Sequence, residues 1–179
     1  PKNTHTILTG PNGSGKSTLL GLISGVLYSQ KGTVRCYKKN FGYIGATPLI
    51  FTGTIKENIL YGNEEHVSDD EIMSYLKKME LFKESKRYNL DEIIDNKSLS
   101  SGQMQKVSFI RALVGNVDIM LLDESTANLD EKSRKLIFDI LRNQEISIIN
   151  STHDPDSFGD VDHRLRIEII DEKRKLIFE

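Results

Sequence analysis

Apolar side chains recur at helical spacing in several stretches of this chain of 179 residues. From Lys16 to Leu27 they fall mostly three or four positions apart, which predicts a helix directly after a glycine-rich segment. Thr54 and Ser68 are each followed three residues later by Glu, an arrangement that satisfies the first free amides of a helix and marks its start. The helices predicted in this way begin at Lys16, Thr54 and Ser68 and near Ser100, and one more spans residues 131–143.

Short runs of β-branched, aromatic or aliphatic residues lie between these helices and predict strands. The expected strands span residues 6–9, 32–37, 41–44, 119–122 and 146–149, with a terminal hairpin over 164–170 and 175–178. Residues 83–98 are polar and are expected to form an exposed loop. Because strands alternate with helices, the pattern predicts an α/β fold in which helices flank a mostly parallel sheet.

The composition is that of an ordinary globular domain, with 37% hydrophobic and 28% charged residues. The formal net charge of −2 argues against binding to a nucleic-acid backbone, so we expect no nucleic-acid partner. A single cysteine, Cys36, excludes an internal disulfide framework and any multi-cysteine metal site. The apolar runs fall far short of the roughly 20 residues that span a bilayer, and no signal peptide opens the chain. Since the chain begins at Pro1, we expect a fragment of a longer protein.

Residues 10–17 read G-P-N-G-S-G-K-S and match the phosphate-binding loop (P-loop) pattern in full. Glycines let backbone N–H groups approach phosphate oxygens, and the following helix adds the positive end of its dipole. Lys16 supplies a mobile positive charge, and the Ser17 hydroxyl is a candidate Mg²⁺ ligand. The predicted nucleotide-binding residues are Gly10, Pro11, Asn12, Gly13, Ser14, Gly15, Lys16, Ser17 and Thr18.

Two carboxylates follow the apolar run 119–122 and are the candidates for metal binding and catalysis. A P-loop enzyme holds Mg²⁺ with a carboxylate at the end of such a strand, so Asp123 joins Ser17 as a predicted metal ligand. Glu124 is the predicted catalytic base, because a second carboxylate at this point can polarise an attacking water. Taken alone, Glu124 is explained equally well as a solvated acid at a strand end.

Residues 99–103 read L-S-S-G-Q and precede a predicted helix, so their amides form a second anion site. With the P-loop, they resemble the ATP-binding-cassette (ABC) family, whose signature motif is LSGGQ. Without that context the pentapeptide could also be a plain helix cap. The resemblance implies ATP and Mg²⁺ as cofactors, and a signature that contacts ATP held by an opposite subunit. The predicted signature residues are Leu99, Ser100, Ser101, Gly102 and Gln103.

Two further motifs follow in the order of the family, and the resemblance covers essentially the whole chain. Residues 125–130 resemble the D-loop, with Asp130 at its acidic position. His153 matches the switch histidine that contacts the γ-phosphate, which makes it a second predicted catalytic residue. The remaining histidines are expected at the surface, and they are His5, His66 and His163.

The segment 51–59 reads F-T-G-T-I-K-E-N-I and resembles the stretch after the Q-loop of ABC exporters. The short path from Gly32 to Tyr43 is similar to the first nucleotide-binding domain of the multidrug-resistance-protein subfamily. The resemblance implies one N-terminally truncated ABC ATPase domain over 1–179. Its P-loop core is expected at 1–45 and 115–179, and the Q-loop region with a helical signature subdomain at 46–114.

Departures from the family pattern bear on function. Ala46 stands where the Q-loop glutamine is expected, and it can neither ligate Mg²⁺ nor orient water. Ser101 replaces a signature glycine, and residues 93–98 lack the Gly-rich acidic pattern usual in exporters. No aromatic residue precedes Gly10 to stack on adenine, so we expect weak adenine recognition and a monomer at rest.

The resemblance implies an ATPase that powers an ABC exporter, at the cytoplasmic face of a membrane. Its expected partners are a transmembrane domain and a second nucleotide-binding domain in a head-to-tail ATP sandwich. A weakly hydrolytic regulatory domain is the first alternative, favoured by Ala46 and Ser101. A non-transport ABC ATPase is the second, although the chain lacks the coiled-coil insertion or basic arms expected there.

Overall fold

The structure is a computed structural model that describes residues 3–36, 40–63, 66–82, 88–159, 161–171 and 173–178. Its elements in chain order are β1 His5–Thr9, α1 Lys16–Ser24, β2 Phe41–Ile44, β3 Gly53–Thr54, α2 Ile55–Leu60, α3 Asp69–Lys78, β4 Ile93–Ile94, α4 Ser101–Val114, β5 Ile119–Asp123, α5 Glu131–Arg142, β6 Ser147–Ser151, the 3₁₀ helix η1 Pro155–Phe158, β7 His163–Ile170 and β8 Lys173–Phe178. They fall into two compact units. Unit 1 comprises Pro1–Gly45, Asp118–Glu124 and Gln144–Glu179, and unit 2 comprises Ala46–Val117 and Ser125–Asn143.

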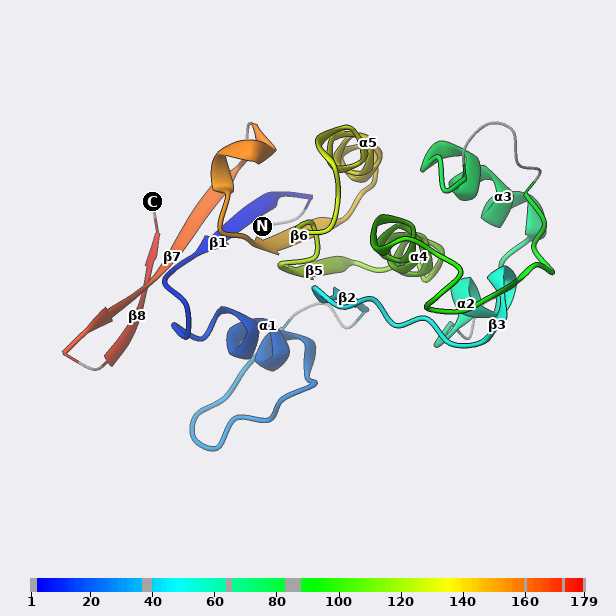
Figure 1. The fold of residues 1–179 in the computed structure, drawn as a ribbon. Coiled ribbons are helices and arrows are strands. Elements are labelled where there is room, and N and C mark those ends of the chain that lie inside the picture. The colour runs from blue at the N-terminus through cyan, green and yellow to red at the C-terminus, as the bar shows by residue number, and fades with distance from the viewer. Residues whose placement is uncertain are drawn as a thin grey trace. The chain divides into compact units, whose positions relative to one another are not determined.

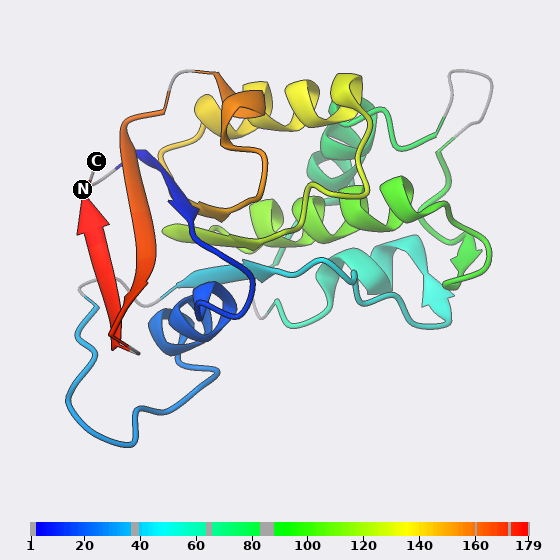
Figure 2. The same cartoon turned by 60° about the vertical axis from the view of Figure 1, so that its left-hand side comes forward.

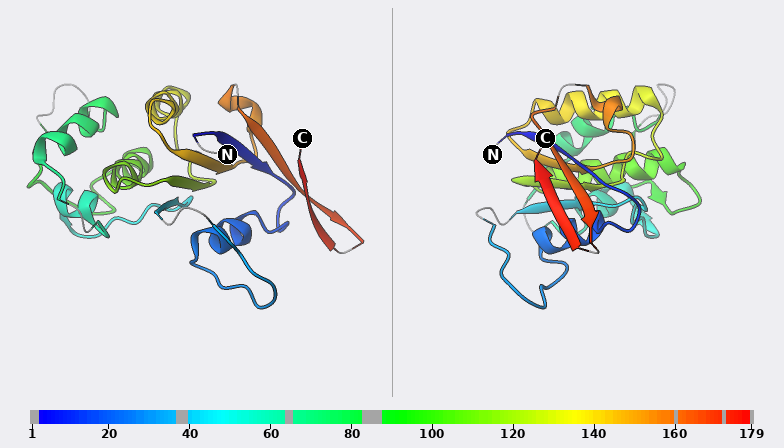
Figure 3. Two further views of the ribbon diagram at one scale, coloured as in Figure 1. Left: turned by 180° about the vertical axis from the view of Figure 1, so that it is seen from behind. Right: turned by 90° about the vertical axis from the view of Figure 1, so that its left-hand side faces the viewer.

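Unit 1 is built on a sheet with the strand order β2-β5-β6-β1-β7-β8 in the described part of the chain. All neighbouring pairs are parallel except the β7–β8 hairpin, which is antiparallel. The hairpin forms one edge of the sheet (Figures 1 and 3). The predicted α/β class and mostly parallel sheet are therefore confirmed.

Helix α1 lies against one face of this sheet (Figures 1 and 2). Leu20 of α1 packs with three sheet residues in one buried cluster, and these residues are Leu8, Leu121 and Ile167. The strands β1, β5 and β7 each contribute one of them, because side chains of neighbouring parallel strands line up on one face. This packing sets the direction in which α1 leaves the sheet, and so positions the loop that joins β1 to α1.

Unit 2 is mainly helical and contains α2, α3, α4 and α5, with β3 and β4 paired antiparallel. Helix α4 packs on both α2 and α3, and its core residues Val107, Phe109 and Ile110 are fully buried. The predicted helix starts are confirmed. The Thr54 side chain accepts from the Glu57 N–H in a full capping box, and the Ser68 side chain accepts from the Glu71 N–H.

Three predicted elements differ from the structure. Residues 32–36 form no strand, and Tyr37 lies outside the described residues. These residues are exposed, so the β-branched Val34 has no sheet surface on which to pack. Helix α1 ends at Ser24, because Gly25 adopts a left-handed conformation with φ 78°, and Leu27 therefore lies outside the helix. The expected loop 83–98 contains the short strand β4, and its residues 83–87 lie outside the described residues.

The surface prediction for histidine is wrong for His5. Its side chain is buried, its backbone N–H donates to Asp162 Oδ2 at 2.7 Å, and its ring lies edge-on to Phe158. His5 begins β1, an interior strand of the sheet, and this position buries it. His163 is half-buried with its ring edge-on to Phe178, whereas His66 is exposed as expected.

Candidate nucleotide-binding site

The predicted P-loop joins the carboxyl end of β1 to the start of α1 in unit 1. Gly10 must be glycine, because its φ is 150° and a Cβ there would lie 2.8 Å from the Ile167 carbonyl oxygen and from Ser14 Oγ. The Ser14 hydroxyl is fully buried and has no hydrogen-bond partner among the described residues. The loop therefore packs its backbone directly on β7.

Helix α1 presents open N–H groups to the loop. Its N-cap is Gly15, at φ 102°, which provides no side-chain cap, and the first turn holds no acidic residue. An α-helix leaves its first four N–H groups without internal partners, so this end of α1 favours an anion. The Lys16 ammonium is held over the loop by the carbonyls of Gly10 at 3.0 Å and Pro11 at 3.4 Å.

Asp123, at the end of β5, lies beside the P-loop and binds two hydroxyl groups. Ser17 Oγ donates to Asp123 Oδ1 at 3.0 Å, and the Tyr43 hydroxyl donates to Asp123 Oδ2 at 2.8 Å. Burial, and then the hydrogen bond to the Asp123 carboxylate, raise the pKa of Tyr43 above its ordinary value. The phenol therefore remains a proton donor to Asp123 at physiological pH.

Glu124 and His153 form a direct pair. Glu124 Oε1 lies 2.8 Å from His153 Nε2, and both side chains are partly exposed. Glu124 adopts a left-handed backbone conformation at φ 53°, which costs energy in a residue other than glycine and is enriched at functional sites. Its backbone N–H donates to the Ser151 carbonyl at 3.1 Å, so the end of β6 helps to hold this conformation.

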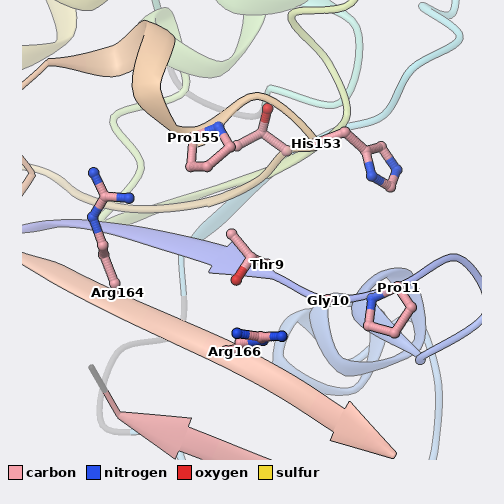
Figure 4. Close-up of a pocket in the computed structure, with 8 residues that line it drawn as sticks. Thr9, Gly10, Pro11, His153, Pro155, Arg164 and Arg166 are labelled. Carbon is pink, nitrogen blue, oxygen red and sulfur yellow. The ribbon is translucent and has the colours of Figure 1, made fainter.

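A cavity of about 460 Å³ opens next to the start of the P-loop (Figure 4). Arg164 and Arg166 reach it from β7, and His153 reaches it from the segment after β6. The two arginines also contact carboxylates, Asp156 at 3.6 Å and Glu168 at 3.5 Å. The other lining residues are Thr9, Gly10, Pro11, Thr152 and Pro155. Two guanidinium groups thus lie beside the loop, each next to a carboxylate.

The predicted signature residues lie in unit 2, at the start of α4. Ser100 caps this helix: its side chain accepts from the Gln103 N–H, and the Gln103 side chain accepts from the Ser100 N–H. Gln103 Nε2 also donates to the Leu81 carbonyl. Gly102 lies in the first turn, where an added Cβ would make an ordinary 3.5 Å contact with the Asn128 carbonyl. Leu99 is buried and Ser101 is exposed.

Asp130 and Ala46 also belong to unit 2. Asp130 is the N-cap of α5, and hydrogen bonds from Ser133 lower the pKa of its carboxyl group. The Ala46 carbonyl accepts a hydrogen bond from Asn128 Nδ2 at 3.0 Å. Ala46 therefore contacts Asn128 through its main-chain carbonyl. A change of side chain at position 46 does not remove this hydrogen bond.

The structure brings together, within unit 1, the predicted P-loop, Asp123, Glu124 and His153. It places the signature residues, Asp130 and Ala46 in unit 2. Sequence reasoning missed Tyr43 and Asn128, and it missed Arg174 of β8, which donates to P-loop carbonyls. For Tyr43 the sequence predicted only that it lies on a strand, and its contact with Asp123 depends on the pairing of β2 with β5 in the folded sheet.

Comparisons with known proteins identify the family of this chain. The sequence profile of the ABC transporter family matches residues 1–127. The chain therefore belongs to the ABC transporter family, in the part that forms the ATP-binding and ATPase domain. The fold is that of a solved structure described as a bacterial Atm1-family ABC exporter with ATP bound, with a TM-score of 0.82 and 24% identity over 93% of this chain and 32% of that one.

Several curated relatives are similar over most of this chain. ATP-dependent permease MDL1 of Candida albicans is 34% identical over 83% of this chain and 25% of its own length. ABC transporter B family member 1 of Dictyostelium discoideum is 34% identical over 76% of this chain and 17% of its own length. The lactococcin-A transport/processing ATP-binding protein LcnC of Lactococcus lactis subsp. lactis is 31% identical over 92% of this chain and 25% of its own length. This chain thus spans a quarter or less of these relatives.

None of its helices, in the described ranges, has the length and apolarity to cross a membrane.

Proposed function

We propose that this chain binds ATP with Mg²⁺ and hydrolyses it to ADP and phosphate. The observation that carries the proposal is the meeting, in unit 1, of an uncapped helix start bearing Lys16 with the Ser17–Asp123 and Glu124–His153 pairs. An anion site, a pair of metal ligands and a candidate base are the parts that phosphoryl transfer to water requires.

The residues present fit a magnesium ion. Ser17 Oγ and Asp123 Oδ1 lie 3.0 Å apart and are both oxygen donors, which Mg²⁺ prefers. When bound, the ion would neutralise charge on the β- and γ-phosphates. Tyr43 holds the other carboxylate oxygen of Asp123 and so orients this ligand.

Glu124 is the proposed general base, placed to orient and polarise a water for in-line attack on the γ-phosphate. His153 lies within hydrogen-bond distance of Glu124 and lines the cavity next to Gly10, which supports its proposed role as a contact to the γ-phosphate. Lys16 and the first N–H groups of α1 stabilise the negative charge of the transferring group.

We further propose that this ATPase powers an ABC exporter, acting in a larger protein at the cytoplasmic face of a membrane. The names of the relatives, which include a permease and a transport/processing protein, support this role. Two nucleotide-binding domains would enclose ATP head to tail, each P-loop facing the signature residues 99–103 of the other. Residues 46–114 would form the helical subdomain, and residues 47–54 would contact the transmembrane domain.

A regulatory nucleotide-binding domain with slow turnover is the second candidate. Ala46 favours it, because no Q-loop side chain can help to position water there. Glu124 and His153 argue against it, because a degenerate site often lacks both residues, and here both are present and in contact.

Phosphate release from Mg-ATP tests the proposal. A general base contributes roughly 10²- to 10⁴-fold to the rate, so Glu124→Gln should lower turnover by at least about 100-fold. Its affinity for Mg-ATP should stay close to that of the wild type, because Gln keeps the size of the side chain. Glu131→Gln, an exposed change at the start of α5, is the control. Equal rates in the wild type and Glu124→Gln would exclude Glu124 as the base, and turnover near zero in both would favour the regulatory domain.

A further inference from the structure

Arg174, in the C-terminal hairpin, binds the P-loop from outside. Its Nε donates to the Ser14 carbonyl at 3.0 Å, and one of its terminal nitrogens donates to the Gly13 carbonyl at 3.4 Å. The hairpin follows the P-loop by some 160 residues, so this contact joins opposite ends of the chain. An Arg side chain donates in a rigid fork, and two adjacent carbonyls suit that geometry.

The contact determines how the loop presents its amides. In a trans peptide the C=O and N–H bonds point in opposite directions across a rigid plane. Because the Ser14 carbonyl points to Arg174, the Gly15 N–H points away from the hairpin, toward the inside of the loop. A hydrogen bond to the carbonyl also polarises the peptide and makes its N–H a better donor.

The absence of a side chain at Gly15 leaves room for Arg174 beside the loop. A Cβ at Gly15 would lie 3.6 Å from Arg174 Cδ and Nε, so the guanidinium side chain passes directly beside the glycine. Arg174 also lines a cavity of about 500 Å³ together with Gly13, Ser14 and Gly15. Since Ser14 N–H is already bound to the Pro11 carbonyl at 3.1 Å, the Gly15 N–H is the amide that Arg174 can direct.

We propose that Arg174 is a positioning residue for phosphate binding: it holds the Ser14–Gly15 peptide so that the Gly15 N–H faces the phosphates of the nucleotide. It does so without contacting the nucleotide. The inference rests on the proposed function, because it requires that the P-loop binds a polyphosphate. It adds a role for the β7–β8 hairpin that the P-loop motif does not contain.

Binding of Mg-ATP and of inorganic tripolyphosphate to the 179-residue chain, measured by calorimetry, tests the proposal. Arg174→Ala should weaken both about tenfold, with little change in the unfolding temperature. Lys173→Ala removes the same charge from the same strand and should leave both affinities within about twofold. Arg174→Lys keeps the charge but loses the fork, and should fall between the wild type and Arg174→Ala.

Two readouts separate positioning from a merely structural role. The Gly15 amide resonance should move in Arg174→Ala, while the amide resonances of unit 2 stay in place. Millimolar methylguanidinium should restore part of the tripolyphosphate affinity of Arg174→Ala and leave Lys173→Ala unchanged.

The proposal is overturned if Arg174→Ala binds both ligands as the wild type does, or if Lys173→Ala weakens binding equally. If Arg174→Ala unfolds, Arg174→Lys decides, and wild-type affinity in that variant also overturns the proposal. Lys16→Ala serves as the separate control for the P-loop itself. Unchanged binding in Lys16→Ala would contradict the proposed function, whatever the Arg174 variants show.

Discussion

Asp123 shows how the site depends on single hydrogen bonds. Its two carboxylate oxygens accept from different hydroxyl groups, one from Ser17 at the start of α1 and one from Tyr43 on β2. A carboxylate held at both oxygens cannot rotate freely, so the orientation of the predicted metal ligand is set before any ligand binds. Tyr43 is therefore an outer partner of the proposed magnesium site.

Replacing Tyr43 by Phe should weaken the binding of the divalent cation. The ring remains but the hydroxyl donor to Asp123 is lost, and removal of such outer partners typically costs about 10- to 100-fold in metal affinity. We expect Mn²⁺, used as a probe for Mg²⁺ in the presence of ADP, to bind at least about tenfold more weakly when measured by electron paramagnetic resonance.

Tyr28→Phe is the matched control for this prediction, because Tyr28 is 90% exposed in the same unit and its replacement should leave Mn²⁺ affinity unchanged. An unaltered Mn²⁺ affinity in Tyr43→Phe would show that the hydrogen bond to Asp123 plays no part in cation binding.

Pairs such as Tyr43–Asp123 could not have been predicted at the residue scale. The sequence shows that β2 and β5 are strands, but which residues lie side by side depends on the strand order and register of the folded sheet. The same holds for Arg174, because its contact with Ser14 requires the hairpin to lie beside the P-loop. The P-loop glycines were predictable, since their roles arise within one short segment.

At the scale of elements, the helix starts are the most local feature of this fold. Thr54 and Ser100 both cap their helices in full capping boxes, and each box requires only residues within one turn. Sequence therefore predicts the starts of these helices well. The strand expected from residue 32 onward shows the opposite case, since residues 32–36 do not form it. A β-branched run becomes a strand only if it can pack on a neighbouring strand.

The N-cap of α5, Asp130, makes a contribution to stability that depends on pH. Hydrogen bonds from Ser133 lower its pKa in the folded chain, with Lys106 and Lys132 adding to the effect. Protons therefore bind more readily to the unfolded chain, so this contribution to stability is present above the ordinary Asp pKa and is lost as the pH falls through the folded value.

Asp130→Asn should flatten this dependence. Asn is as good an N-cap as Asp, so the variant should remain close to the wild type at pH 7 and should lose less stability on acidification to about pH 3. Urea unfolding at the two pH values measures the difference. Asp139→Asn, which changes a charge within α5 without touching its cap, should behave as the wild type, and an Asp130→Asn profile as steep as the wild type would disprove the cap titration.

At the scale of the whole molecule, the proposed ATP sandwich requires two nucleotide-binding domains, which two copies of this chain can supply. If ATP joins each P-loop to the signature of the other copy, blocking hydrolysis should trap the pair. Glu124→Gln should therefore elute with the mass of a dimer in Mg-ATP and as a monomer in Mg-ADP, as measured by light scattering after size exclusion.

Gly102→Glu in the Glu124→Gln background should remain monomeric in Mg-ATP. An acidic residue in the first turn suits the dipole of α4, and the Cβ would make only an ordinary contact with Asn128, so the fold should tolerate it. Its charge would repel the γ-phosphate of the other copy. A dimer that persists in this double variant would contradict a role for the signature in trans.

The β7–β8 hairpin has a consequence for solubility as well. Strand β8 is the edge of the sheet in the described residues, and an edge strand offers unpaired backbone groups that invite strands of other molecules. Lys173 and Lys175 are exposed along that edge, and lysine on edge strands is a common protection against intermolecular pairing. Three consecutive basic residues thus have two roles. Arg174 binds the P-loop, and its lysine neighbours oppose pairing of this edge with strands of other molecules, and so oppose aggregation.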